Sequence, residues 1–101
     1  MLRYAGLMDE QPQVRLTATV TGTVQGVGFR YYTREQARGL ALTGIAANEA
    51  DGSVLIVAEG ADPAVRALAQ WLTSAAAPGR VDNVDASYGE PTGEFHDFRT
   101  G

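Results

Sequence analysis

The sequence predicts an α+β fold in which two helices cover one face of a four-stranded antiparallel sheet. Several short segments alternate apolar and polar residues, as half-buried strands do. Two longer segments repeat apolar residues at intervals of three and four, as amphipathic helices do. In chain order these segments predict β-α-β-β-α-β, followed by a short C-terminal strand.

The chain has 101 residues, which corresponds to a single domain. We assign this domain to residues 14–101 and expect residues 1–13 to form a flexible N-terminal extension. The extension lacks the apolar middle and cleavage site of a signal peptide. A translation start at Met8 is an equally good interpretation of this segment.

The first predicted strand covers residues 14–21, and a helix is predicted at about 30–41. The apolar face of the strand contains Val14, Leu16, Ala18 and Val20. The buried stripe of the helix is predicted to contain Phe29, Thr33, Ala37, Leu40 and Ala41. Between strand and helix lies a glycine-rich loop, 22–28.

A hairpin and a second helix are predicted next. The Asp51-Gly52 pair separates two apolar runs, 43–50 and 53–60, so these runs should pair as antiparallel strands. Asp62 is predicted to cap the second helix, with Pro63 at its first helical position, and Pro78-Gly79 to end it. Its apolar stripe is Val65, Leu68, Ala69 and Leu72, widened by Trp71, which we interpret as a core residue.

The last segments complete the predicted sheet. A fourth strand with imperfect alternation is indicated by Val81, Val84, Ala86 and Tyr88, and a short last strand by Phe95 and Phe98. Two split β-α-β units in this order predict a ferredoxin-like sandwich. A fold of this kind does not determine a function.

Composition excludes several classes of protein. The formal net charge of −4 and the pI of about 4.7 argue against a nucleic-acid or anionic-membrane surface. No apolar run approaches the ~18 residues of a membrane span. The chain has no cysteine, so disulfides and thiolate metal sites are excluded. A protein without disulfides suits a reducing compartment, so we expect a cytoplasmic location.

The inventory of catalytic side chains is sparse. His96 is the one histidine, so a Ser/His/Asp triad is implausible, and we interpret His96 as a solvated bystander. The acidic residues Glu90, Glu94 and Asp97 lack the spacing of metal ligands and are interpreted as a solvated loop. No metal or cofactor is therefore expected.

The glycine-rich stretch 22–30, GTVQGVGFR, is the remaining candidate. Its spacing fits neither a Walker loop nor a dinucleotide fingerprint. A glycine turn that leads into a helix N-terminus can cradle an anion with backbone N–H groups, and Arg30 adds a charged fork suited to phosphate. A turn that only needs glycine flexibility is an equally good interpretation of the local sequence. Arg34 and Arg38 follow on the same helix line and are interpreted as a solvated face that can pair with Glu35.

GTVQGVGFR resembles the signature of the acylphosphatase family, G-x-V-Q-G-V-x-F-R. The similarity continues as T-x-x-x-A in the helix, L-x-L-x-G after it, and x-x-N-x-x-D-G into the hairpin. It covers residues 14 to about 72 well and the C-terminal part loosely. The predicted order of elements matches the fold of that family.

The resemblance implies hydrolysis of the carboxyl–phosphate anhydride of acyl phosphates without a metal or cofactor. It implies that Arg30 and the loop hold the phosphoryl group and that Asn48 orients the attacking water. The implied phosphate-binding residues are Gln25, Gly26, Val27, Gly28, Phe29 and Arg30. Together with Gly22, the glycines would leave room for the phosphoryl group. The expected partner is a small-molecule acyl phosphate, and the expected state is a monomer.

Three features depart from the family pattern. The segment 44–48 lacks the bulky aromatic that members often carry, and Glu49 brings a negative charge beside Asn48. Glu49 should point to the opposite face of its strand. The pair Phe98-Arg99 is a shortened form of the last strand, which leaves its register open.

Other functions remain open at this point. A non-catalytic module that binds phosphate or acyl phosphate would keep the cradle but would not need Asn48. A domain of the kind found at the N-termini of carbamoyl-transferring maturation enzymes is disfavoured because no further domain follows. An RNA-binding module is disfavoured by the net charge of −4.

Overall fold

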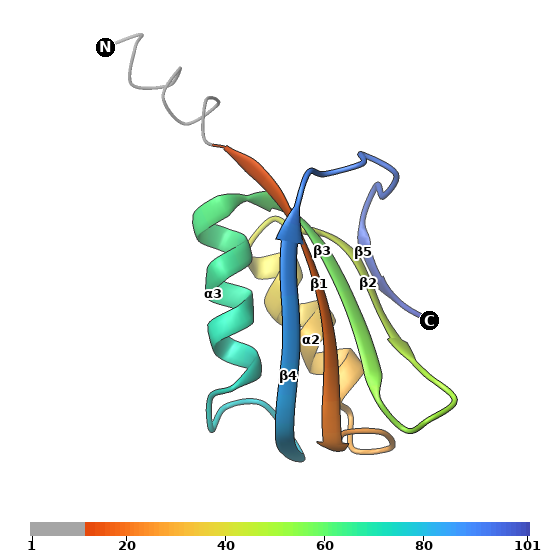
Figure 1. The fold of residues 1–101 in the computed structure, drawn as a ribbon. Coiled ribbons are helices and arrows are strands. Elements are labelled where there is room, and N and C mark those ends of the chain that lie inside the picture. The colour runs from red at the N-terminus through yellow and green to blue at the C-terminus, as the bar shows by residue number, and fades with distance from the viewer. Residues whose placement is uncertain (1–11) are drawn as a thin grey trace, which may run out of the picture.

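The computed structural model describes residues 12–101, and within them it contains two helices and five strands. The elements are β1 (Gln13–Thr23), α2 (Phe29–Gly39), β2 (Thr43–Asn48), β3 (Val54–Ala61), α3 (Asp62–Leu72), β4 (Arg80–Gly89) and β5 (Phe98–Thr100). Both helices lie on one side of the sheet (Figure 1). The predicted α+β class and element order are confirmed.

The sheet has the strand order β4-β1-β3-β2-β5. The first four of these strands pair antiparallel, as predicted, and β5 pairs with β2 in parallel, so the whole sheet is mixed. In this register Phe98 lies opposite Gly44 and Arg99 opposite Ile45. Phe95, which we expected to mark the last strand, lies in the loop before it.

The core lies between the sheet and the two helices. Leu16, Ala18 and Val20 of β1 are fully buried, which confirms the predicted apolar face. The other fully buried apolar side chains among residues 12–101 are Val24, Phe29, Ala37, Ala46, Val54, Ile56, Ala58, Val65, Leu68, Leu72 and Phe98. Trp71 is partly buried and packs against this cluster, as predicted. Within residues 12–101, no helix is long and apolar enough to cross a membrane.

Both helices differ from the prediction at their ends. Helix α2 ends at Gly39, two residues before the predicted end. Ala41, which was predicted to be buried, is exposed with a φ of 60°, and Leu42 is buried instead. Helix α3 is capped by Ala61, because Asp62 is already helical and pairs with Arg66 one turn later, at 2.5 Å. It ends at Leu72, before the predicted stop at Pro78-Gly79, and turns follow it.

The start of the described chain is tied to the fold. Gln13 begins β1 opposite Ala61, and the carbonyl of Pro12 accepts a hydrogen bond from the amide of Asp62 at 2.8 Å. The predicted extension, 1–13, therefore includes two ordered residues, and the rest of it lies outside the described residues.

Candidate functional site

The glycine loop ends in a helix start with open backbone donors. Gly26 and Gly28 have φ values of 77° and 82°, which glycine adopts far more cheaply than other residues. The first helical bond of α2 runs from the amide of Tyr32 to the carbonyl of Gly28, at 3.0 Å. The N–H groups of residues 29–31 thus have no intrahelical partner, and no side chain caps them. An anion at this position would meet donors and the positive end of the helix dipole.

Gly22 has a different role from the one we expected. The pairing of β1 with β4 shifts register between Thr21 and Gly22, as in a β-bulge. A Cβ at Gly22 would lie 2.1 Å from the carbonyl oxygen of Arg80. Glycine is therefore required here by the close approach of β4, and the prediction that Gly22 leaves room for a phosphoryl group is wrong.

A cavity of about 180 Å³ opens at the start of α2. It is lined by Val24, Gly26, Gly28, Phe29, Arg30, Tyr31, Arg34 and Thr100. Four of the six predicted phosphate-binding residues are among them. The lining also contains four residues that were not among the predicted phosphate-binding residues. Val24 is a position of the signature, whereas Tyr31, Arg34 and Thr100 lie outside it.

Two residues of the signature anchor the mouth of this cavity. The ring of Phe29 is buried in the core, with its centroid 6.3 Å from that of Trp71, so it holds the first turn of α2 against the fold. The guanidinium of Arg30 donates from Nη1 to the backbone oxygen of Gly101 at 2.5 Å. Gly101 in turn donates its amide to the carbonyl of Ala46 at 2.9 Å, which extends the β2–β5 pairing. Arg30 is therefore steadied by the C-terminal end of the described chain.

Gln25 connects the glycine loop to the β2–β3 hairpin. Its Nε2 donates to the carbonyl of Glu49 at 2.9 Å and to that of Ser53 at 2.8 Å. Its side chain thus braces the loop from outside the cavity. Val27, 39% exposed, lies beside Gly79 and is likewise absent from the lining.

The sheet register places Asn48 at the same end of the molecule. Asn48 is the last residue of β2 and lies opposite Val54, which in turn lies opposite Val20 of β1, just before the glycine loop. Asn48 lies two residues after the buried Ala46, so its side chain is on the same face of the sheet, the face that carries the helices. Its neighbour Glu49 accepts the hydrogen bond from Gln25. Asn48 is exposed and does not line the cavity itself.

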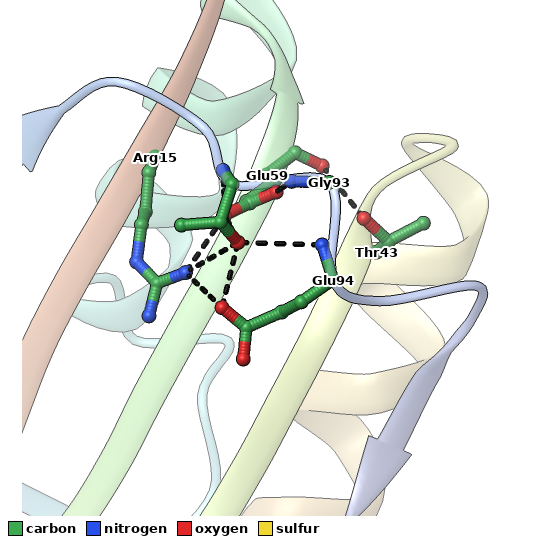
Figure 2. Close-up of polar contacts among 6 residues, drawn as sticks. Arg15, Thr43, Glu59, Gly93 and Glu94 are labelled. Atoms are coloured by element: carbon green, nitrogen blue, oxygen red, sulfur yellow. Dashed lines mark hydrogen bonds and ion pairs between the residues drawn. The ribbon is translucent and has the colours of Figure 1, made fainter.

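A buried carboxylate on the other face of the sheet was not predicted. Glu59 of β3 is 5% exposed and accepts hydrogen bonds from Arg15 Nη1 at 2.8 Å and from the amides of Thr92 and Gly93 at 2.9 and 3.0 Å (Figure 2). It accepts a further bond from the Thr92 hydroxyl at 3.0 Å. These contacts anchor the 90–97 loop, which joins β4 to β5 (Figure 1).

The charge state of Glu59 follows from these contacts. Burial by itself raises the pKa of the carboxyl, but the two backbone amides, the Arg15 guanidinium and the Thr92 hydroxyl together lower it to about 2. Glu94, on the same loop, also pairs with Arg15, at 3.1 Å. The carboxylate of Glu59 is thus ionised and fully engaged in holding the loop.

The remaining charged residues divide into confirmed and corrected predictions. His96 is exposed, as expected. Among residues 12–101, no group of three or more His, Cys, Asp or Glu side chains is arranged for a metal, and a metal-free site stays a prediction. Arg34 pairs with Glu35 at 3.3 Å, also as expected. Arg38 is exposed, as expected, but its partner is not Glu35: it donates to Asp97 Oδ2 at 2.9 Å and to the carbonyl of Phe98 at 3.1 Å. Glu94 and Asp97 are therefore parts of ion pairs that hold the C-terminal loop.

The fold and the cavity define an α+β protein with a glycine-lined cavity at a helix start. A family model described as acylphosphatase matches residues 16–100. A protein of Paenarthrobacter aurescens named acylphosphatase is 56% identical over 86 residues, which cover 85% of this chain and 92% of the relative. The chain belongs to the acylphosphatase family.

Solved structures agree with this assignment. An acylphosphatase from Coxiella burnetii is 33% identical, with a TM-score of 0.80, over 92% of this chain and 96% of that one. An acylphosphatase from Bacillus subtilis is 27% identical, with a TM-score of 0.80, over 87% of this chain and 98% of that one.

Proposed function

We propose how this acylphosphatase acts: it hydrolyses the carboxyl–phosphate anhydride of an acyl phosphate to a carboxylate and inorganic phosphate. The observation that carries the proposal is the cavity at the start of α2, which is lined by Arg30 and by residues whose backbone N–H groups have no intrahelical partner. These are the donors that a phosphoryl group needs on its equatorial oxygens. Gly26 and Gly28 let the backbone itself approach the anion.

The reaction requires little from the protein beyond positioning. A water oxygen forms a bond to phosphorus while the bond from phosphorus to the carboxyl oxygen breaks, and the carboxylate leaves with the electron pair. Because this leaving group is a stable anion, no general acid is needed. Charge that develops on the phosphoryl oxygens is stabilised by the cradle and by Arg30. The proton of the attacking water passes to a phosphoryl oxygen.

Asn48 is proposed to orient the water. Its position supports this role, because it ends β2 at the level of the glycine loop and precedes the residue that Gln25 binds. An amide oxygen can accept a hydrogen bond from water and fix its approach, although it cannot act as a strong base. Gln25 is proposed to keep the cradle and Asn48 at a constant separation.

The same chemistry leads us to propose that no metal takes part. A guanidinium and backbone amides supply the charge stabilisation that Mg²⁺ provides in other phosphoryl transfers. We further propose a cytoplasmic monomer that binds no nucleic acid. The cysteine-free sequence supports a reducing compartment. The net charge of −4 argues against binding to nucleic acid. The exposed Asp82 and Asp85 on the edge strand β4 disfavour pairing with the sheet of a second copy, which supports a monomer.

Benzoyl phosphate hydrolysis, followed by ultraviolet absorbance, tests the proposal. The rate should be unchanged after exhaustive treatment with EDTA, and stoichiometric benzoate and phosphate should form. Loss of activity with EDTA and its recovery with Mg²⁺ would refute the metal-free mechanism. Saturable binding of phosphate with no hydrolysis would show a binding module.

A further inference from the structure

Three arginines follow one another along α2, and the structure gives them different partners. Arg30 donates to Gly101, and Arg38 holds Asp97 and the carbonyl of Phe98. Arg34, which lies between them, lines the same cavity as Arg30. Residues four apart on a helix have Cβ atoms about 5–6 Å apart, so the cavity has two guanidinium side chains on one wall.

Arg34 is held in place but keeps donors for a ligand. Its side chain is 26% exposed, its Cζ lies 5.0 Å from the centroid of the Tyr31 ring, and Nε donates to Glu35 at 3.3 Å. Within residues 12–101 this is its one hydrogen bond, whereas a guanidinium has five N–H groups. Glu35 is 47% exposed, and such a surface pair stabilises little. An anion inside the cavity can therefore share Arg34 with Glu35.

The shape of the cavity connects Arg34 to the acyl group of the substrate. A phosphoryl group bound at Gly26, Gly28 and Arg30 leaves the rest of the cavity to the acyl group. Besides the apolar side chains of Val24 and Phe29, that remainder is lined by Tyr31 and Arg34 on α2 and by Thr100 on β5. Arg34 supplies a positive charge to it, and Thr100 supplies a hydroxyl.

We propose that Arg34 is a specificity-determining residue that selects acyl phosphates whose acyl group carries a second anion, a carboxylate or a phosphate, a few bonds from the anhydride. The inference rests on the function proposed above. The net charge of −4 would otherwise disfavour an additional negative charge, so a preference for one requires a local cation. Arg34 supplies that cation one helical turn from the cradle.

The test compares two substrates that differ in one distal charge, benzoyl phosphate and 3-carboxybenzoyl phosphate. Their aromatic rings are rigid, and the added carboxylate is ionised at neutral pH. The wild type should show a kcat/KM about fivefold higher for the carboxylated substrate, which is typical of a partly exposed charge-assisted contact. In Arg34→Gln the ratio should fall to about one or below. In the control Arg66→Gln, an exposed arginine on α3 that pairs with Asp62, the wild-type ratio should remain.

The outcomes separate this inference from the proposed function. A wild-type ratio of one or less, or an Arg34→Gln ratio equal to that of the wild type, would overturn the specificity role. Calorimetric binding of benzoylphosphonate and 3-carboxybenzoylphosphonate provides a readout that needs no hydrolysis. Tighter binding of the carboxylated ligand, lost in Arg34→Gln, would support the subsite even if neither phosphate were hydrolysed, and that result would refute only the proposed function. Equal binding of both ligands would refute the subsite.

Discussion

Replacing Glu59 with Gln should destabilise the fold strongly and in a pH-dependent way. The carboxylate of Glu59 accepts hydrogen bonds from two backbone amides, a hydroxyl and a guanidinium while 5% exposed. A glutamine would present an NH₂ group to some of these donors and would carry no charge to face Arg15. The loop 90–97 would then lose its contacts with Glu59, while the Arg38–Asp97 pair would remain.

The magnitude follows from the pKa of the Glu59 carboxyl, which is lowered from an ordinary 4.5 to about 2. Each pKa unit corresponds to about 1.4 kcal/mol, so the ionised carboxylate stabilises the fold by on the order of 3 kcal/mol. Because the folded pKa is below the unfolded one, this stabilisation is complete above pH 4.5 and is lost as the pH falls towards 2. At about pH 3, about 2 kcal/mol of it should be gone.

Urea denaturation, followed by the fluorescence of the single tryptophan, Trp71, measures this directly. Glu59→Gln should be less stable than the wild type by on the order of 3 kcal/mol at about pH 7, and the difference should shrink to about 1 kcal/mol at about pH 3. The exposed Glu90→Gln is the matched control and should follow the wild type at each pH. A difference between Glu59→Gln and the wild type that does not change with pH would refute this account of the carboxylate.

Further predictions concern the cavity and its braces. Arg30→Ala should lower kcat/KM for benzoyl phosphate by about 10³-fold and should abolish competitive inhibition by phosphate; unchanged inhibition would place the cradle elsewhere. Asn48→Ala should lower kcat by about 10²-fold while the inhibition constant of phosphate changes less than about threefold, and a wild-type kcat would remove its role with water. Gln25→Ala removes the hydrogen bonds to Glu49 and Ser53, so urea denaturation should show a free energy of unfolding lower by about 1–2 kcal/mol. The same variant should lower kcat more than it lowers phosphate affinity. Equal losses of kcat and of phosphate affinity would contradict a bracing role.

The sequence predicted the order of elements because each has a strong local pattern. The alternation in β1, the Asp51-Gly52 turn and the apolar stripe of α3 depend on neighbours in the chain, and all three are confirmed. The helix ends were harder to predict. Asp62 pairs with Arg66 in the first turn and does not cap the helix, and both arrangements suit an acidic residue at that position.

The parts of the site that the sequence missed depend on contacts between distant segments. Thr100 reaches the cavity only because β5 pairs in parallel with β2, and no local pattern indicates that pairing. Gly22 looked like part of the cradle because the contact that requires glycine comes from Arg80. Glu59 interrupts an apolar run, and a carboxylate in a strand is the signal that could have indicated a buried ionic contact.

Arg34 shows how one residue can satisfy a prediction and still be misjudged. Its pair with Glu35 was correctly predicted, but the side chain was interpreted as solvated. The helix spacing puts Arg34 one turn after Arg30, on the wall of the cavity. Periodicity identifies which residues share a face, but the position of β5 decides what that face encloses.

The central claim is that water attacks a phosphoryl group held at the start of α2. Hydrolysis of benzoyl phosphate in ¹⁸O-labelled water, with excess EDTA, tests it most directly by mass spectrometry of both products. The account predicts that the label enters inorganic phosphate, that benzoate stays unlabelled, and that Arg30→Ala abolishes the enzyme-dependent label. Label in benzoate would show attack at the carbonyl carbon and would contradict the proposed role of the cradle.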